Sequence, residues 1–299
     1  MAYFSGQATN DQDLLQALMQ AATGVGWSRS GNVLKNASGA FLFALATNAR
    51  GIILTAGTDG ANNSLVNAMP ESISTNNAKT SDGAVVLPQA AFPVTYFIHC
   101  FENEVYLIYR HSIDIYLWLA FGAEDKKIWC SASCKKSIDL SSSYINSMSI
   151  SEVGGGVSFL CPAPFWLNGV YSANSGYNSY VYDPVLGWSP QKVESNSIAG
   201  IEIKTPLIAR SVANWSDNSL LIPISPSKIM PSNKISQIIE LKHSRYFRLT
   251  NYIPEQVIQL GPDKWKVYPF YKRNRESPNG TSREPHTGTL GWAIRYDGP

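Results

Sequence analysis

Residues 94–110 read Val94-Thr-Tyr-Phe-Ile-His-Cys-Phe-Glu-Asn-Glu-Val-Tyr-Leu-Ile-Tyr-Arg110. β-Branched and aromatic side chains fill both halves of this stretch, and Glu102-Asn-Glu104 separates the halves. Two such runs joined by a short polar turn are typical of a β-hairpin. The apolar segment that follows, 113–121, fits a third strand of a meander or a short helix, and its pattern does not distinguish the two.

Further strands are predicted on the N-terminal side of this hairpin. Trp27–Leu34, Ala40–Thr47 and Gly51–Ala56 are short apolar runs, and turn residues such as Ser30-Gly31-Asn32 interrupt them. The polar residues 58–83 that follow are expected to form an exposed loop, which is either mobile or a contact with a partner.

One helix is expected, near the N-terminus. Thr9-Asn-Asp-Gln12 matches a capping box, and apolar residues recur at helical spacing through residues 13–22. Gly24 or Gly26 would end this helix. Its apolar stripe consists of Leu14, Leu18, Ala21 and Val25, with Leu15 and Ala22 beside it. Such an amphipathic helix is expected to pack on a sheet.

The C-terminal part of the chain again predicts strands. Val257–Leu260 and 264–271 flank a turn at Gly261-Pro-Asp-Lys264, so they are expected to form a hairpin. After a charged loop at 272–285, the chain ends on the apolar segment Leu290-Gly-Trp-Ala-Ile-Arg-Tyr296. Because terminal residues usually fray, this tail is expected to be buried in a sheet, either its own or a neighbour's. Other strands are expected at 198–210, 219–224, 235–241 and 246–249.

Together these patterns predict an α+β fold that is predominantly β, with antiparallel sheets or a sandwich and one N-terminal amphipathic helix packed on them. Residues 1–299 are expected to form a single β-rich structural unit, long enough to bury a substantial core. Two subdomains, with a soft boundary near 125–155, are the alternative.

Charge is scarce in this chain. Charged residues make up 15% of it, against roughly 25% in typical soluble domains. Ser, Asn, Thr and Gln supply the polarity instead, which suits packing against other subunits because few charges must be desolvated. A chain rich in β-turns favours the same residues. The net charge is +2 and the lysines occur in isolated pairs such as Lys126-Lys127, so no nucleic acid sequence recognition is expected.

The sequence shows no recognisable targeting signal. Residues 1–6 lack the basic and apolar regions of a secretory signal, and no apolar run has the length of a membrane span. We therefore expect synthesis in a cytoplasm and no membrane span.

No metal-binding or cofactor-binding residue is assigned from the sequence. Cys130 and Cys134 have the spacing of a zinc half-site, but the second half-site is missing. The neighbours His99 and Cys100 would point to opposite faces of a strand. With Cys161 these cysteines are expected to be buried or idle thiols.

No catalytic residue is assigned either, and an enzyme is not expected. Glu102 and Glu104 could imitate the paired carboxylates of a glycosidase, but a solvated hairpin tip explains them better. Gly154-Gly-Gly156 lacks the ending of a phosphate-binding loop. The four histidines, which form no metalloprotease motif, are His99, His111, His243 and His286.

An aromatic cluster offers an alternative function in carbohydrate binding. Its members, which would form a platform for a glycan, are Trp166, Tyr177, Tyr180, Tyr182 and Trp188. Since aromatic side chains dominate the cores of β-rich proteins, core packing is the other interpretation.

Several short motifs follow one another across nearly the whole chain. They are Met1–Asn10, Pro93–His99, Trp118–Gly122, Ser147–Ile150, Asn178–Tyr182, Pro206–Arg210, Arg245–Tyr252, Gly261–Val267 and His286–Asp297. In their content and order they resemble a family of virion structural proteins of tailed bacteriophages, which are built into the tail or the neck between head and tail.

That resemblance implies a non-enzymatic structural protein of the virion, assembled in the host cytoplasm as part of a ring in the neck, collar or tail. Its partners would be copies of itself and other virion neck or tail proteins. The family contributes no catalytic residues. A receptor- or glycan-binding tail-tip protein of the baseplate region is the alternative, and a cell-wall-degrading enzyme is a third interpretation.

Overall fold

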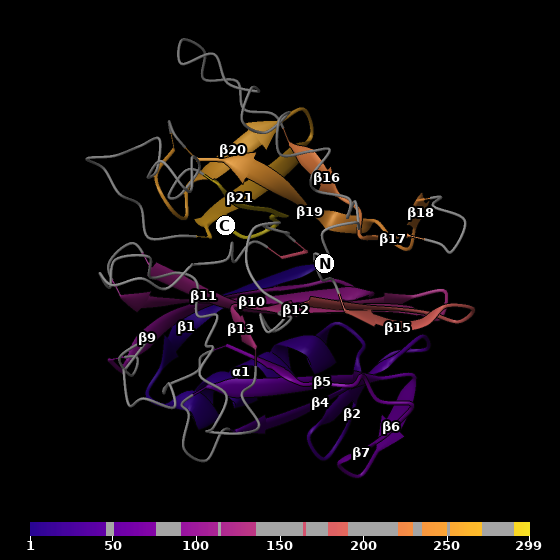
Figure 1. Cartoon of the computed structure of the whole chain (residues 1–299). Helices are drawn as coiled ribbons and strands as arrows, with labels where there is room; N and C mark the ends of the chain where they lie inside the picture. Colours follow the sequence, from indigo (N-terminus) through magenta and orange to yellow (C-terminus); the bar gives the residue numbers. More distant parts are fainter. Residues whose placement is uncertain are drawn as a thin grey trace, which may run out of the picture.

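The fold is a stack of antiparallel β-sheets with one helix, shown by a computed structural model of the chain (Figure 1). The structure describes residues 1–45, 51–75, 91–112, 115–135, 164–165, 179–190, 221–229, 235–249, 252–270 and 290–299. The predicted fold class, predominantly β with an N-terminal helix, is confirmed.

Three sheets form the layers. The central sheet has the order β1 (Ala2–Ala8), β9 (Val94–Cys100), β10 (Glu104–Ser112), β11 (Ile115–Glu124), β12 (Lys127–Ala132), β14 (Ser179–Asp183), β15 (Gly187–Pro190). The N-terminal sheet has the order β13 (Cys134–Lys135), β8 (Ile73–Ser74), β5 (Ile52–Gly57), β4 (Ala40–Leu45), β3 (Val33–Lys35), β2 (Ser28–Ser30). The C-terminal sheet has the order β16 (Ile222–Ile224), β19 (Leu241–Arg248), β22 (Leu290–Arg295), β21 (Asp263–Pro269), β20 (Val257–Leu260).

Smaller elements complete the description. The helix α1 (Asp11–Gly24) contacts β1 and β9 of the central sheet. Two short hairpins pair β6 (Asp59–Ala61) with β7 (Ser64–Val66), and β17 (Ser227–Ile229) with β18 (Ile235–Gln237).

The central sheet is buried on both faces. Along β10, the side chains of Val105, Leu107 and Tyr109 join the core beneath α1 and the N-terminal sheet. The alternate residues Tyr106 and Ile108 join the core beneath the C-terminal sheet. A strand covered on both sides needs apolar residues at every position, which is why 94–110 reads as continuous apolar runs.

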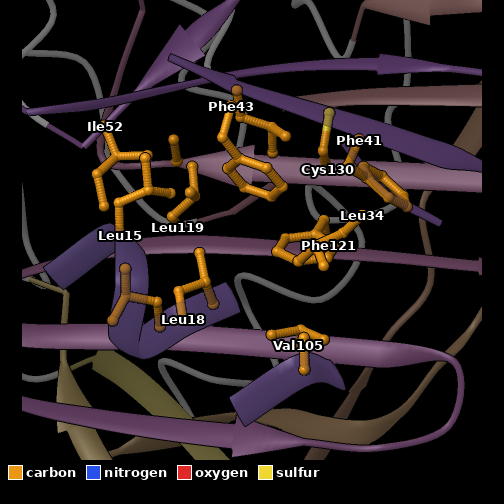
Figure 2. Packing of buried hydrophobic residues seen from close by; sticks show 14 of the residues in the cluster. Leu15, Leu18, Leu34, Phe41, Phe43, Ile52, Val105, Leu119, Phe121 and Cys130 are labelled. Atoms are coloured by element: carbon orange, nitrogen blue, oxygen red, sulfur yellow. The ribbon is translucent and has the colours of Figure 1, made fainter. Parts of the chain in front are cut away.

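The first core lies between the central sheet, α1 and the N-terminal sheet (Figure 2). Phe121 of β11 stands at its centre, with ring centroids 4.7 Å from Phe41 and 5.3 Å from Phe43, both on β4. Leu15 and Leu18 project into the same core from α1. The apolar stripe predicted for the helix is therefore its buried face.

The second core lies between the central and C-terminal sheets and is mainly aromatic. Trp292 of β22 has ring centroids 5.5 Å from Tyr106, 6.5 Å from Trp118 and 5.4 Å from Phe270. β22 lies between β19 and β21, so the apolar tail is buried in its own sheet. The prediction for this tail is confirmed and its two alternatives are resolved.

Most predicted strands are confirmed where the structure describes them. The hairpins β9–β10 and β20–β21 form as expected, and the described part of the segment 113–121, residues 115–121, belongs to the strand β11 and not to a helix. The predicted strand 198–210 and the charged loop 272–285 lie outside the described residues, as does most of the boundary range 125–155.

The segment 58–83, predicted as an exposed polar loop, contains an ordered hairpin in its first part. β6 and β7 form a hairpin there, and its turn residues Asn62 and Asn63 have φ values of 50° and 63°. Asparagine tolerates this left-handed region better than most residues, so a polar sequence still makes an ordered turn. The side-chain oxygen of Asn63 also accepts a 2.8 Å hydrogen bond from the backbone N–H of Asn32.

The capping pattern is displaced by one residue. Asn10, and not Thr9, is the N-cap, because its side chain accepts a 2.8 Å hydrogen bond from the backbone N–H of Asp13. Asp13 takes the part expected of Gln12, since its carboxylate accepts from the Thr9 backbone N–H at 3.1 Å. A carboxylate in the first turn is also favoured by the helix dipole.

The close packing of β22 predicts a sharp effect of one methyl group. A Cβ atom at Gly291 would lie 2.0 Å from the carbonyl oxygen of Tyr268 on β21, whereas a Cβ at Gly24 would meet nothing within 4 Å. Gly291→Ala should lower the free energy of unfolding by about 1–3 kcal/mol or more through overpacking. Gly24→Ala, at a helical position with room for the methyl group, should instead raise it by about 0.4–1 kcal/mol. Urea unfolding of both variants tests this, and equal effects would contradict it.

Candidate functional site

Buried polar groups gather where the central sheet meets the C-terminal sheet. Burying a polar group is unfavourable unless it is hydrogen-bonded, so this junction is the part of the described chain where specific chemistry can be sought. It contains two clusters, one around His99 and Lys266 and one around Glu104.

His99 on β9 is buried and held by two hydrogen bonds. Its Nδ1 lies 3.2 Å from the carbonyl oxygen of Arg295, and its Nε2 lies 2.9 Å from the hydroxyl of Tyr268. A carbonyl oxygen only accepts, so Nδ1 carries the proton and Nε2 accepts from Tyr268. Burial lowers the pKa of His99 to about 3, which keeps the ring neutral.

The ammonium group of Lys266 lies among aromatic rings beside His99. Its Nζ is 4.8 Å from the ring centroid of Tyr3, 5.1 Å from that of Phe97 and 5.2 Å from that of Tyr296. It also donates a 2.9 Å hydrogen bond to the Tyr3 hydroxyl. Cations are attracted to aromatic faces at these distances. We name Tyr3, Phe97, His99, Lys266, Tyr268 and Tyr296 the terminal cluster, because it joins β1 to the residue after β22.

Glu104 on β10 closes an irregular part of β19. Opposite Pro223 and Ile224, the partners on β19 are Arg245 and Leu241, so the intervening residues 242–244 bulge away from β16. The Glu104 carboxylate accepts hydrogen bonds from the backbone N–H groups of Lys242 at 2.7 Å and His243 at 3.0 Å. A carboxylate thereby replaces the acceptors that a regular ladder would supply.

Further groups complete this second cluster. The Tyr106 hydroxyl lies 2.7 Å from the Glu104 carboxylate and 3.0 Å from the Ser244 hydroxyl. On the other side of the bulge, the Arg245 guanidinium donates to the carbonyl oxygens of Leu241 at 2.7 Å and Ser244 at 2.8 Å. Burial raises the pKa of Glu104, while its hydrogen bonds and Arg245 oppose that shift.

His243 is stacked within the bulge. Its ring lies parallel to that of Phe101, with centroids 3.9 Å apart and an interplanar angle of 3°. Burial and the neighbouring cations lower its pKa to about 4. A neutral imidazole against an aromatic ring packs the hairpin turn of β9–β10 onto β19.

A third polar contact lies at the margin of the junction. The Glu255 carboxylate, just before β20, pairs with the guanidinium of Arg110 and accepts a 2.7 Å hydrogen bond from the Tyr116 hydroxyl. Glu255 has a φ of 70°, a left-handed conformation that is unfavourable for glutamate. The contacts with β10 and β11 hold it there.

The two glutamates at the hairpin tip differ in a way that the sequence did not predict. Glu102 is exposed, as a solvated turn requires, but Glu104 is 4% exposed. They therefore do not form an exposed carboxylate pair of the glycosidase kind. The prediction of a solvated tip is confirmed for Glu102 and wrong for Glu104, because β19 folds over it.

The cysteines are not brought together as a metal site where they are described. Cys100 and Cys130 are buried, and burial raises the pKa of both thiols. The Cys130 sulfur lies 3.6 Å from that of Met69. Cys161 and His286 lie outside the described residues. Across the described ranges, no three His, Cys, Asp or Glu side chains gather as metal ligands do.

The proposed aromatic platform is only partly described. Trp166 and Tyr177 lie outside the described residues, and Tyr180 is buried in the first core. Tyr182 and Trp188 are half-buried on β14 and β15, with ring centroids 5.2 Å apart. The Trp188 indole donates a 2.7 Å hydrogen bond to the carbonyl oxygen of Asn67. Core packing is thus correct for Tyr180, and the remaining pair keeps some exposed surface.

Comparison with protein-family models gives no match, and no curated protein is similar to this chain in sequence. Among the described residues, no helix has both the length and the hydropathy needed to cross a bilayer.

The polar groups of the junction join two layers of the fold. Contacts between the central sheet and the C-terminal sheet are made by His99, His243, the Glu104 carboxylate and Lys266.

The buried carboxylate predicts a difference between the two hairpin glutamates. Glu104→Gln places an amide donor against backbone donors, and leaving buried donors unsatisfied costs about 1–3 kcal/mol. We expect a loss of about 2 kcal/mol in the free energy of unfolding, measured in urea at neutral pH. Glu102→Gln is the matched control and should change stability by less than about 0.5 kcal/mol. Equal effects of the two substitutions would refute the assignment.

The buried histidines predict a loss of stability in acid. The pKa of His99 is about 3 in the folded chain and 6.5 in the unfolded chain, so its contribution is complete above pH 6.5 and is lost as the pH falls towards 3. By pH 4 the loss from His99 is on the order of 3 kcal/mol. His243 acts in the same direction, and Glu104, whose pKa is raised, acts in the opposite one.

Urea unfolding between pH 7 and pH 4 measures this effect. The slope of stability against pH should be smaller in His99→Gln than in the unsubstituted chain, whatever the stability of the variant at pH 7. Parallel slopes would show that His99 does not titrate on unfolding.

Proposed function

We propose that this chain is a non-enzymatic structural protein of a tailed bacteriophage virion, which assembles with copies of itself as part of a ring in the neck, collar or tail. The observation that carries the proposal is that the buried side chains most capable of chemistry serve to join the sheets. His99, Glu104 and Lys266 are each engaged in bonds between sheets. The proposal of a bacteriophage virion rests on the short sequence motifs, which resemble this family in their content and in their order along the chain.

The surface composition supports assembly. Few charges must be desolvated when such a chain packs against neighbours, because only 15% of its residues are charged. Large apolar side chains are also exposed on it, among them Ile253 at 64% and Val257 at 39%. Apolar side chains suit the buried centre of a contact between identical subunits, which is more apolar than the rest of the surface. The partners would be sister copies and other neck or tail proteins.

A second function, receptor or glycan binding at the tail tip, is favoured by one observation. Tyr182 and Trp188 form a half-buried aromatic pair, and the Trp188 indole is bonded to the backbone of the exposed Asn67. Sugars bind where an aromatic face adjoins polar groups, because their C–H faces are apolar and their hydroxyls are not. Glycan-array signal from the isolated protein, lost in Trp188→Ala, would support this function in place of the first.

Analysis of purified virions tests the proposal directly. We expect mass spectrometry of intact particles to find the chain in several copies, and particles made with a chain that lacks residues 290–299 to contain none, because β22 lies between β19 and β21. Removal of residues 297–299 alone is the control and should leave incorporation intact. Absence of the full-length chain from particles would end the proposal, as would turnover of peptidoglycan or polysaccharide by the isolated protein.

A further inference from the structure

The first strand of the chain is an open edge of the central sheet. β1 pairs with β9 through all seven residues, from Ala2 opposite Cys100 to Ala8 opposite Val94, without a bulge. On its other side, no described strand pairs with it. Its central residues Phe4 and Ser5 are exposed. Among the described strands, β1 is therefore paired on one side only.

This edge lacks the features that usually prevent strand addition. Natural edge strands carry charges, prolines or bulges that block pairing with another chain. β1 has the sequence Ala2-Tyr-Phe-Ser-Gly-Gln-Ala8, with no charge and no proline. At the opposite edge of the same sheet, β15 ends on Pro190. Of the two described edges of the central sheet, β1 is thus the unprotected one.

The neighbouring layer exposes apolar side chains on the same flank. β20 is the edge strand of the C-terminal sheet, and its Val257 is paired with Lys266. The Lys266 ammonium reaches the Tyr3 hydroxyl on β1 at 2.9 Å, so β20 and β1 belong to one side of the stack. β20 also carries no charge, and Val257 and Leu260, which point to opposite faces of the strand, are 39% and 41% exposed.

We propose that this flank is a two-fold interface with a second copy of the chain, in which β1 pairs antiparallel with β1 of the partner and the apolar residues of β20 pack against the same residues of the partner. A two-fold contact brings each strand against itself. A charged residue on such a strand would lie close to the same charge on the partner copy. Because β1 and β20 carry no charged residue, this repulsion is absent, which favours a second copy of the chain as the partner.

Full overlap fixes the register of this pairing. Ser5 is the middle residue of β1, so it lies opposite Ser5 of the partner, and Phe4 lies opposite Gly6 of the partner. Within each copy the ring of Tyr96 already covers Gly6, since a Cβ atom at Gly6 would lie 2.7 Å from the Tyr96 hydroxyl, so this pair adds no aromatic cover of bare backbone. Two strands alone make a narrow contact, and a standard interface buries about 800 Å² per partner. The side chains of β20 supply the additional area.

This proposal names one contact of the self-assembly proposed above. It rests on self-association of the chain and does not depend on location in a virion. A ring that contains this contact needs a second, different contact to continue beyond the pair. The terminal cluster has a defined part in it, since Lys266 of β21, the strand next to β20, is bonded to Tyr3 of β1.

A charge-exchange experiment tests the contact. In Ser5→Lys or Ser5→Glu, each variant alone brings two like charges together at the two-fold axis, so sedimentation equilibrium should give a lower mass than that of the unsubstituted protein. An equimolar mixture of the two variants brings opposite charges together and should restore the mass. Val185→Lys is the matched control, because Val185 is 89% exposed at the turn between β14 and β15, and it should leave the mass unchanged.

Every outcome decides the question. Circular dichroism that matches the unsubstituted protein shows that a variant is folded. The double substitution Val257→Ser with Leu260→Ser leaves β1 unchanged, and it should also weaken the association. It is the second test in case a charge at Ser5 disturbs β1 itself. An oligomer that survives Ser5→Lys, or one that the mixture fails to restore, overturns this contact but leaves self-assembly standing. An unsubstituted protein that is monomeric at all concentrations overturns both the contact and the assembly proposed above.

Discussion

The structure depends on one constraint, which is that the central sheet must be covered on both faces. β9, β10 and β11 carry apolar side chains at successive positions, so neither face tolerates water. The helix and the N-terminal sheet cover one face, and the C-terminal sheet covers the other. Because each cover is contributed by a different part of the chain, the segments on both sides of 94–132 have to return to the same sheet.

Apolar packing alone does not fix how the layers are oriented, because the hydrophobic effect is not directional. The polar groups of the junction supply direction. Glu104 accepts two backbone N–H groups of the bulge at 242–243, and His99 joins Tyr268 to the backbone at Arg295. A displacement of the C-terminal sheet by one residue would break both sets of bonds and leave buried groups without partners. These few contacts therefore select one arrangement among many that would bury similar apolar area.

The sequence predicted the elements whose signals are local. Residues 94–110, the stripe of α1 and the apolar tail each show their structure in their own periodicity or composition. β1 was not predicted, because Ala2–Ala8 mixes small and polar residues and becomes a strand only through β9. The burial of Glu104 was not predicted either, since its partners Lys242 and His243 lie far away in the sequence and turn residues are usually solvated. The terminal cluster likewise has no local signature, although an apolar tail that ends on Tyr296 could have suggested an aromatic contact.

The pairing of β1 with β9 has a consequence for biosynthesis. About 90 residues are translated between the two strands, which at roughly 5–20 residues per second takes on the order of 5–20 s. During this time β1 has emerged but its partner strand has not been made. Under the pairing of β1 with β1 proposed above, this segment would meet the same segment of a neighbouring nascent chain on one polysome, and the timing of translation would then couple the folding of each copy to the presence of the next.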